Sequence, residues 1–172
     1  MGRARLFGTI GVIGLVVTLA VLLRRDAGSD GFEGLGTPAP DVELASFSGE
    51  TYSLERFVGR PLVLNFWASW CAPCASEMPD FERVHHDLEG EVAFLGVNQR
   101  DVRDGALDLA EATGVTYPLA YDPRGEIFDA FGAPGMPTTV FIASDGTVVE
   151  VVPGQLSAGL LRDYIRRSFG VT

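Results

Sequence analysis

The apolar residues of this chain form one long uninterrupted run and several shorter ones, separated by amphipathic and turn-rich stretches. The long run covers residues 6–23, and two of the shorter runs cover 61–67 and 92–97. Apolar runs of the shorter length are typical of strands that are buried on both faces. Stretches in which apolar residues recur every three or four positions predict helices between them. The pattern therefore predicts a region of alternating strands and helices that follows an apolar N-terminal segment.

Helices alternate with strands in the middle of the chain, and a hairpin and a helix end it. The last hairpin turns at Ser144-Asp145-Gly146, a strong turn sequence. Pro79 lies inside a predicted helix, where we expect a kink or a break. This order predicts an α/β fold in which helices cover both faces of a mixed sheet. We predict strands at 41–47, 51–53, 61–67, 92–97, 117–121, 138–143 and 147–152, and helices at 53–56, 72–88, 101–113, 125–131 and 157–169.

The N-terminal apolar run has the length of a membrane span. As a helix it would extend about 27 Å at about 1.5 Å per residue, close to the hydrocarbon thickness of a bilayer. Arg3 and Arg5 precede it, and the residues after Leu23 offer no small-x-small cleavage site. We expect an uncleaved signal anchor; a cleaved signal peptide and a buried helix are the alternatives. The predicted organisation is a cytoplasmic n-region at 1–5, a single transmembrane helix at 6–23, a flexible linker at 24–36 and a globular domain at 37–172.

Charge is distributed unevenly along the chain. The whole chain has a net charge of −10, whereas the residues after position 25 hold 9 arginines against 23 acidic residues, a net charge of −14. A surface this acidic repels nucleic acid, and the sequence contains no basic stripe that would oppose this. We therefore expect no nucleic-acid partner.

The only two cysteines of the chain stand in the sequence Cys71-Ala72-Pro73-Cys74. A predicted buried strand leads into them and a predicted helix follows. Cysteines three residues apart across a first helical turn come close enough for a disulfide. The unpaired N–H groups and the dipole at a helix N-terminus favour a thiolate, the attacking species in disulfide exchange. We predict that Cys71, the outer sulfur, is the nucleophile and that Cys74 resolves the mixed disulfide; a structural disulfide and half of a metal site are the alternatives.

Two flanking sequences resemble those of thioredoxin. They are Phe66-Trp67-Ala68-Ser69-Trp70, which leads into the cysteines, and Gly135-Met136-Pro137-Thr138-Thr139, which opens a strand. The resemblance is specifically to the membrane-anchored, extracytoplasmic TlpA/ResA type, which includes proteins of cytochrome c maturation, and it covers about 36–169. It implies a thioredoxin fold with a four- to five-stranded central sheet and an extra N-terminal β-hairpin. It also implies an inserted βα element between the second buried strand and Met136-Pro137.

The resemblance also implies a substrate-binding surface around the cysteines. In the family, the proline that matches Pro137 is cis and faces the cysteine pair. The backbone of Met136 would then be free to pair with a substrate strand; an ordinary trans proline before a strand is the alternative. Trp70 is expected at the rim beside Cys71, whereas Trp67 is expected in the core. Pro73 is expected in the first turn of the helix, as part of the same surface.

Glu77 is the third candidate catalytic residue. It lies three residues, or one helical turn, after Cys74. In the TlpA/ResA type an acid at this spacing manages the protons of the sulfurs. Thioredoxin has a buried aspartate at the position of Asn65, and an amide cannot take up a proton, so Glu77 is the remaining candidate. The alternative is an acid that only suits the helix dipole. His85 and His86 are expected to face solvent.

These observations predict an extracytoplasmic thiol–disulfide oxidoreductase that reduces protein disulfides. We expect no cofactor beyond a redox-active Cys71–Cys74 disulfide and no metal. The expected partners are protein disulfides, such as those of apocytochrome c, a membrane-embedded thiol donor, and the cell membrane, which the chain would cross once. A disulfide-forming oxidase is one alternative. A copper chaperone or a non-catalytic binding module on the same fold is another, although no histidine follows His86. A peroxidase of the peroxiredoxin type is disfavoured, because Ala68 and Leu64 stand where its Thr or Ser and its Pro are required.

Overall fold

The computed structural model describes residues 34–171. The predicted n-region, the predicted transmembrane helix and most of the predicted linker lie outside the described residues. Within residues 34–171, none of the helices has the length and apolar character that crossing a bilayer requires.

A five-stranded mixed sheet forms the centre of the domain, in the order β5-β4-β3-β6-β7. β4 runs parallel to its neighbours β3 and β5, whereas β6 runs antiparallel to β3 and β7. A separate antiparallel hairpin, β1-β2, precedes the sheet in the chain. The strands are β1 (Glu43–Ala45), β2 (Thr51–Ser53), β3 (Leu62–Trp67), β4 (Ala93–Gln99), β5 (Leu119–Asp122), β6 (Thr138–Ile142) and β7 (Val148–Pro153).

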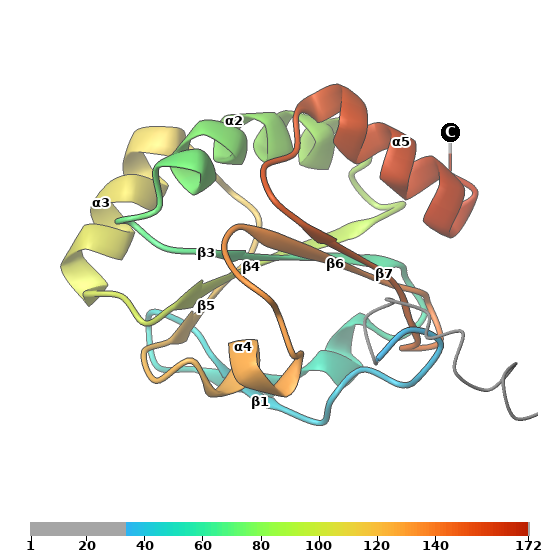
Figure 1. Ribbon diagram of the computed structural model, residues 1–172, viewed down its shortest axis with the longest axis horizontal. Helices are drawn as coiled ribbons and strands as arrows, with labels where there is room; N and C mark the ends of the chain where they lie inside the picture. Colours follow the sequence, from blue (N-terminus) through green and yellow to red (C-terminus); the bar gives the residue numbers. More distant parts are fainter. Residues whose placement is uncertain (1–33, 172) are drawn as a thin grey trace, which may run out of the picture. The chain divides into compact units, whose positions relative to one another are not determined.

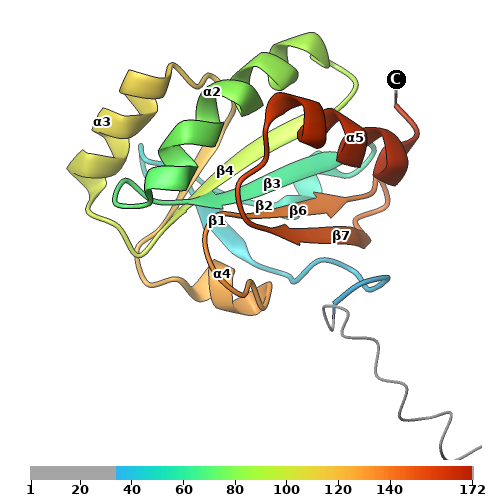
Figure 2. The same ribbon diagram turned by 45° about the horizontal axis from the view of Figure 1, so that its top comes forward.

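Helices cover both faces of this sheet (Figure 1). α2, α3 and α5 lie on one face, and α4, the 3-10 helix η1 and the hairpin lie on the other. Figure 2 shows α2 and α5 side by side over β3, β6 and β7. The helical elements are η1 (Leu54–Phe57), α2 (Ala72–Asp87), α3 (Arg103–Thr113), α4 (Glu126–Ala130) and α5 (Ala158–Phe169). The expected α/β architecture with a mixed sheet is confirmed, and β5 with α4 forms the expected βα element before Met136-Pro137.

The central strand β3 is buried on both faces, which explains its continuous apolar sequence. Successive side chains of a strand point to opposite faces. Leu64 and Phe66 accordingly pack in the core beneath α4 and the hairpin, whereas Val63 packs in the core beneath α2 and α5. Asn65 shares the face of Val63, and this alternation points its amide at the helix that begins with the cysteines.

The helix α2 continues through Pro79, which is exposed, so of the expected kink or break the break does not occur. One local prediction on α2 was wrong. His85 does not face solvent: its ring lies 5.3 Å from the ring of Phe94 and 5.8 Å from that of Tyr117, measured between centroids. Burial among these rings lowers the pKa of His85. The reason is its register, because His85 follows the buried Phe81 by four residues and therefore shares its face of the helix.

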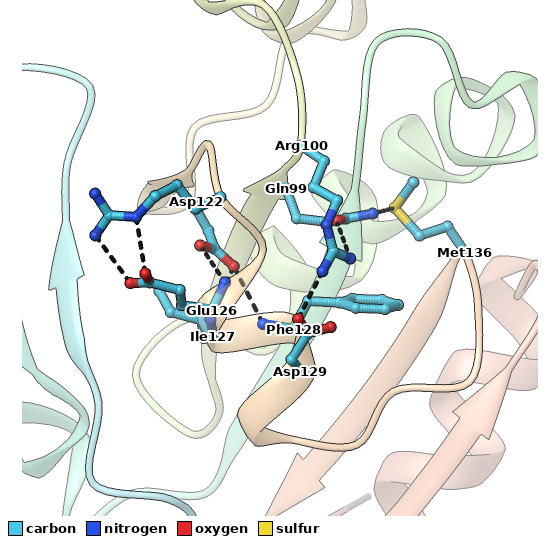
Figure 3. Close-up of polar contacts among 9 residues, drawn as sticks. Gln99, Arg100, Asp122, Glu126, Ile127, Phe128, Asp129 and Met136 are labelled. Carbon is cyan, nitrogen blue, oxygen red and sulfur yellow. Dashed lines mark hydrogen bonds and ion pairs between the residues drawn. The ribbon is translucent and has the colours of Figure 1, made fainter.

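A buried carboxylate organises the start of α4. Asp122, the last residue of β5, accepts hydrogen bonds from the backbone N–H groups of Glu126, Ile127 and Phe128, at 2.9, 3.0 and 3.1 Å (Figure 3). These donors belong to the first turn of the helix, which has no partners of its own for them. Asp122 thus fixes the short helix α4 to the end of β5.

Replacing Asp122 with alanine is expected to lower the free energy of unfolding by about 2–3 kcal/mol, because buried N–H groups lose their acceptor. Guanidinium unfolding of the oxidised protein measures this change. Asp108→Ala, on the exposed side of α3, is the matched control and should shift the free energy by less than about 0.5 kcal/mol. Equal effects of the two substitutions would show that Asp122 does not anchor α4.

Candidate active site

Cys71 and Cys74 form a disulfide at the N-terminus of α2. Cys71 is the N-cap residue, with extended backbone angles, and Cys74 lies in the first turn of the helix. Their Cα atoms are 5.3 Å apart, and the amide N–H of Cys74 donates to Sγ of Cys71 at 3.3 Å. Cys71 is 5% exposed, whereas Cys74 is fully buried. The sulfur of Cys71 is therefore the one nearer to solvent, and it has a backbone N–H donor that can stabilise a thiolate.

A carboxylate fixes the loop between β3 and the cysteines. Asp101 accepts hydrogen bonds from the backbone N–H of Ser69 at 2.5 Å and from its hydroxyl at 2.7 Å. The amide of Asn98, at the end of β4, donates to the same carboxylate at 2.9 Å. Although burial acts to raise it, these hydrogen bonds hold the pKa of Asp101 below its usual value. The loop that delivers Cys71 is thus attached to the neighbouring strand by an ionised side chain.

The residues next to Cys71 in the chain are exposed. Trp70 is 61% exposed, and its indole Nε1 donates to the backbone oxygen of Arg100 at 3.1 Å. Ala72 and Pro73 are also exposed, at the first two positions of α2. These residues adjoin Cys71 in the chain and are exposed, and the direction of the indole is set by its contact with the residue that follows β4.

The Met136–Pro137 peptide bond is cis, as expected. It lies immediately before β6, the strand that pairs with β3. Met136 is half-buried and packs against the cluster that contains both cysteines, whereas Pro137 is buried. The N-terminus of α2 and the start of β6 therefore lie together at one end of the sheet, although they are far apart in the sequence.

Glu77 is fully buried one helical turn after Cys74. Its Oε1 accepts a hydrogen bond from Nδ2 of Asn65 and its Oε2 accepts one from the backbone N–H of Leu156, both at 2.9 Å. Burial raises the pKa of Glu77 from its usual 4.5 to about 7, although these two hydrogen bonds act to lower it. A carboxyl group with such a pKa is close to half-ionised at neutral pH, so it can both accept and donate a proton there.

Asn65 serves Glu77 as a hydrogen-bond donor. Its Nδ2 lies 2.9 Å from Oε1 of Glu77 and 3.3 Å from Oγ1 of Thr139, which is its cross-strand partner on β6. The amide has no proton to exchange, so it stabilises the carboxylate without competing for its proton. Of the three side chains joined by these hydrogen bonds, Glu77 is therefore the one that can titrate.

Sequence reasoning missed the residues that support the site. They lie where β4 ends. Asp101 accepts hydrogen bonds from Ser69 and Asn98, Gln99 donates to Met136, and Arg100 accepts from Trp70. The sequence did contain a signal for these residues. The carboxyl ends of neighbouring parallel strands lie at the same edge of a sheet, so polar residues that follow one strand lie near the residues that follow the next. The run Asn98-Gln99-Arg100-Asp101 follows a buried strand, as the loop of Cys71 does.

The family assignment follows from residues 35–151, which match the model of the AhpC/TSA family. The chain belongs to the AhpC/TSA family. Within it, thiol-disulfide oxidoreductase ResA of Oceanobacillus iheyensis is 32% identical over 136 residues, which are 76% of this chain and 71% of the relative. ResA of Bacillus subtilis is 27% identical over 166 residues, which are 95% of this chain and 93% of the relative.

Solved structures are similar over the same region. A DsbF homologue from Corynebacterium diphtheriae superposes with a TM-score of 0.72 at 28% identity, covering 82% of this chain and 96% of that one. The DsbF structure of MTB gives a TM-score of 0.69 at 27% identity, covering 74% and 94%. The fold is thioredoxin-like, and the chain is a thiol–disulfide oxidoreductase of the ResA/DsbE type, a class that acts on protein disulfides.

Proposed function

We propose that this protein reduces protein disulfides outside the cytoplasm, with Cys71 as the nucleophile, Cys74 as the resolving thiol and Glu77 as the group that carries the proton of Cys74. The observation that supports this most is the buried carboxyl of Glu77, one turn from a sulfur that solvent does not reach. A buried thiol needs a nearby base before it can attack, and this carboxyl is ionisable near neutral pH.

The proposed reaction begins with the reduced pair. The Cys71 thiolate attacks one sulfur of a substrate disulfide, so that a mixed disulfide forms and the other substrate sulfur leaves as a thiolate. Glu77 then accepts the proton of Cys74. The Cys74 thiolate attacks Sγ of Cys71, which closes the Cys71–Cys74 disulfide and releases the second substrate thiolate. Two electrons have passed from the pair to the substrate, and the two substrate thiolates take up the proton released through Glu77 and one from solvent.

Return to the reduced state requires an external dithiol. We propose a thiol protein in the membrane as the donor and no cofactor beyond the cysteine pair. The apolar run 6–23 supports anchoring to the cell membrane by a single span, with the redox domain on the outer side. Relatives named ResA and the resemblance to the TlpA/ResA type support apocytochrome c as one substrate.

The Cys71–Cys74 pair is expected to have a reduction potential more negative than about −200 mV, well below the −120 mV or so of a strong oxidase. Such an oxidase stabilises its reduced form strongly, whereas a reductase must give up its electrons readily to the substrate disulfide. Equilibration with glutathione buffers, read by alkylation and mass shift, measures the potential. A value near −120 mV would assign the chain to the alternative function, disulfide formation.

A further inference from the structure

Gln99 is a buried amide to which the proposed reaction assigns no part. It is the last residue of β4 and only 3% exposed. Its Nε2 donates to Sδ of Met136 at 2.8 Å, and its Oε1 accepts from Nη1 of Arg100 at 3.3 Å (Figure 3). Alternate residues of β4 up to Val97 pack in the core on the α4 side of the sheet, and Gln99 continues that face. Both ends of the amide are therefore engaged, one of them by the residue before the cis proline.

Arg100 connects Gln99 to Trp70. Its φ of +47° lies in the left-handed region, which residues other than glycine rarely adopt. In this conformation its backbone oxygen accepts the indole N–H of Trp70, while its guanidinium donates to Gln99. Arg100 thus contacts Trp70 directly and Met136 indirectly, through Gln99.

The guanidinium of Arg100 is itself held in place by α4. Asp129 lies 2.6 Å from Nη2, and the ring of Phe128 lies 5.7 Å below the guanidinium carbon. The position facing it is Gly125, where a Cβ atom would overlap the guanidinium. Figure 3 shows the side chain of Arg100 between Gln99 and Asp129, which belongs to α4. The segment 125–129 therefore provides both the ion-pair partner and the space for this side chain.

We propose that Gln99 and Arg100 are positioning residues, which hold Trp70 and Met136 in the orientation that receives a polypeptide disulfide. This inference rests on the proposed function and on the substrate-binding surface expected from the sequence, to which Trp70 and Met136 belong. A small disulfide needs only the sulfur of Cys71, whereas a polypeptide must also place its backbone along Met136 and pass Trp70. Gln99 and Arg100 should therefore raise the rate of reaction with polypeptide disulfides, but not with small disulfides, and should leave the reactivity of Cys71 unchanged.

The test compares two substrates of the reduced full-length protein. One is a peptide with an internal disulfide, and the other is 5,5′-dithiobis(2-nitrobenzoate), a small aromatic disulfide. Gln99→Leu keeps the size of the side chain and removes both polar contacts. Arg100→Gly keeps the left-handed backbone and the bond to Trp70, and removes only the guanidinium. Each variant should slow the reaction with the peptide about tenfold, the scale of one lost hydrogen bond, and the reaction with the small disulfide less than about twofold.

Arg124→Ala is the matched control. Arg124 forms an exposed ion pair with Glu126 on the same helix, as Arg100 does with Asp129, but donates to neither Gln99 nor Met136. It should leave both rates within about twofold of the original protein. Two variants are used so that a folding failure of one, detected by thermal unfolding, leaves the other to decide.

Trp70→Ala and Met136→Ala separate failure of the inference from failure of the proposed function. If these two slow the peptide reaction while Gln99→Leu and Arg100→Gly do not, the positioning role is wrong and the substrate surface stands. If none of the four slows it selectively, the proposed substrate surface is wrong and the inference falls with it. Equal slowing of both substrates by Gln99→Leu and Arg100→Gly would also overturn the inference, because it would indicate a general loss of Cys71 reactivity.

Discussion

Replacing Cys71 with serine is expected to reduce the rate of disulfide exchange by at least about a thousandfold, the scale on which covalent catalysts lose activity with their nucleophile. Cys74→Ser should instead accumulate a mixed disulfide, because the remaining thiol attacks but nothing releases the substrate. The structural reason is the difference in accessibility: Cys71 reaches solvent and receives the N–H of Cys74, whereas Cys74 is enclosed. Non-reducing gel electrophoresis after incubation with an oxidised peptide distinguishes the two outcomes.

The two serine variants are controls for each other. Both remove the same disulfide and leave one thiol in the same helical turn, so a general loss of structure would affect them alike. Accumulation of the mixed disulfide by Cys71→Ser, and not by Cys74→Ser, would reverse the assigned order of attack. Trapping with the Cys74→Ser variant in the native host would additionally identify the protein substrates.

The second large effect is expected from the carboxyl of Glu77, in the dependence of stability on pH. The pKa of Glu77 is raised in the folded protein to about 7 from the ordinary 4.5. Between these values the unfolded chain releases this proton and the folded protein keeps it, so a rise in pH through this window favours unfolding. From pH 4 to pH 8 the folded protein should lose about 3 kcal/mol relative to Glu77→Gln, which has no proton to release.

Guanidinium unfolding of the oxidised protein and of Glu77→Gln at a series of pH values measures this difference. Asp80→Asn is the matched control. Asp80 lies on the same helix and accepts the backbone N–H of Ala158 at 2.9 Å, as Glu77 accepts that of Leu156, but it is only half-buried. It should follow the pH dependence of the unmodified protein in this window. Stability curves of the protein and of Glu77→Gln that run parallel from pH 4 to pH 8 would contradict the raised pKa.

The features that the sequence predicted well are those encoded by neighbouring residues. The strand before Cys71 and the helix after it follow from an apolar run and from a first turn with Pro73. The position of Glu77 one turn after Cys74 needs only the period of a helix. His85 shows the limit of the same reasoning, because its spacing from Phe81 was available in the sequence and indicates a shared buried face.

Contacts between distant segments could not be predicted in this way. Leu156, which donates to Glu77, is 79 residues away from it, and Met136 is 37 residues away from Gln99. Each depends on which strands become neighbours and on where each strand ends. The sequence predicted that buried strands exist, but the register of β4 beside β3 determines that Gln99 reaches Met136. Apart from the cis bond of Met136-Pro137, which the family resemblance implied, the surroundings of the cysteines could therefore be predicted only for residues of the helix α2 itself.

The cysteine bridge closes a ring between residues only three positions apart. Closing so short a segment removes little conformational freedom from an unfolded chain, so the bridge adds little to the architecture that the sheet and its helices already maintain. The hydrogen bonds from Ser69 to Asp101 hold the loop before Cys71 in place, and they do not involve sulfur. We therefore expect the fold of the domain to be maintained in both oxidation states of the cysteine pair, so that electron exchange is not coupled to refolding.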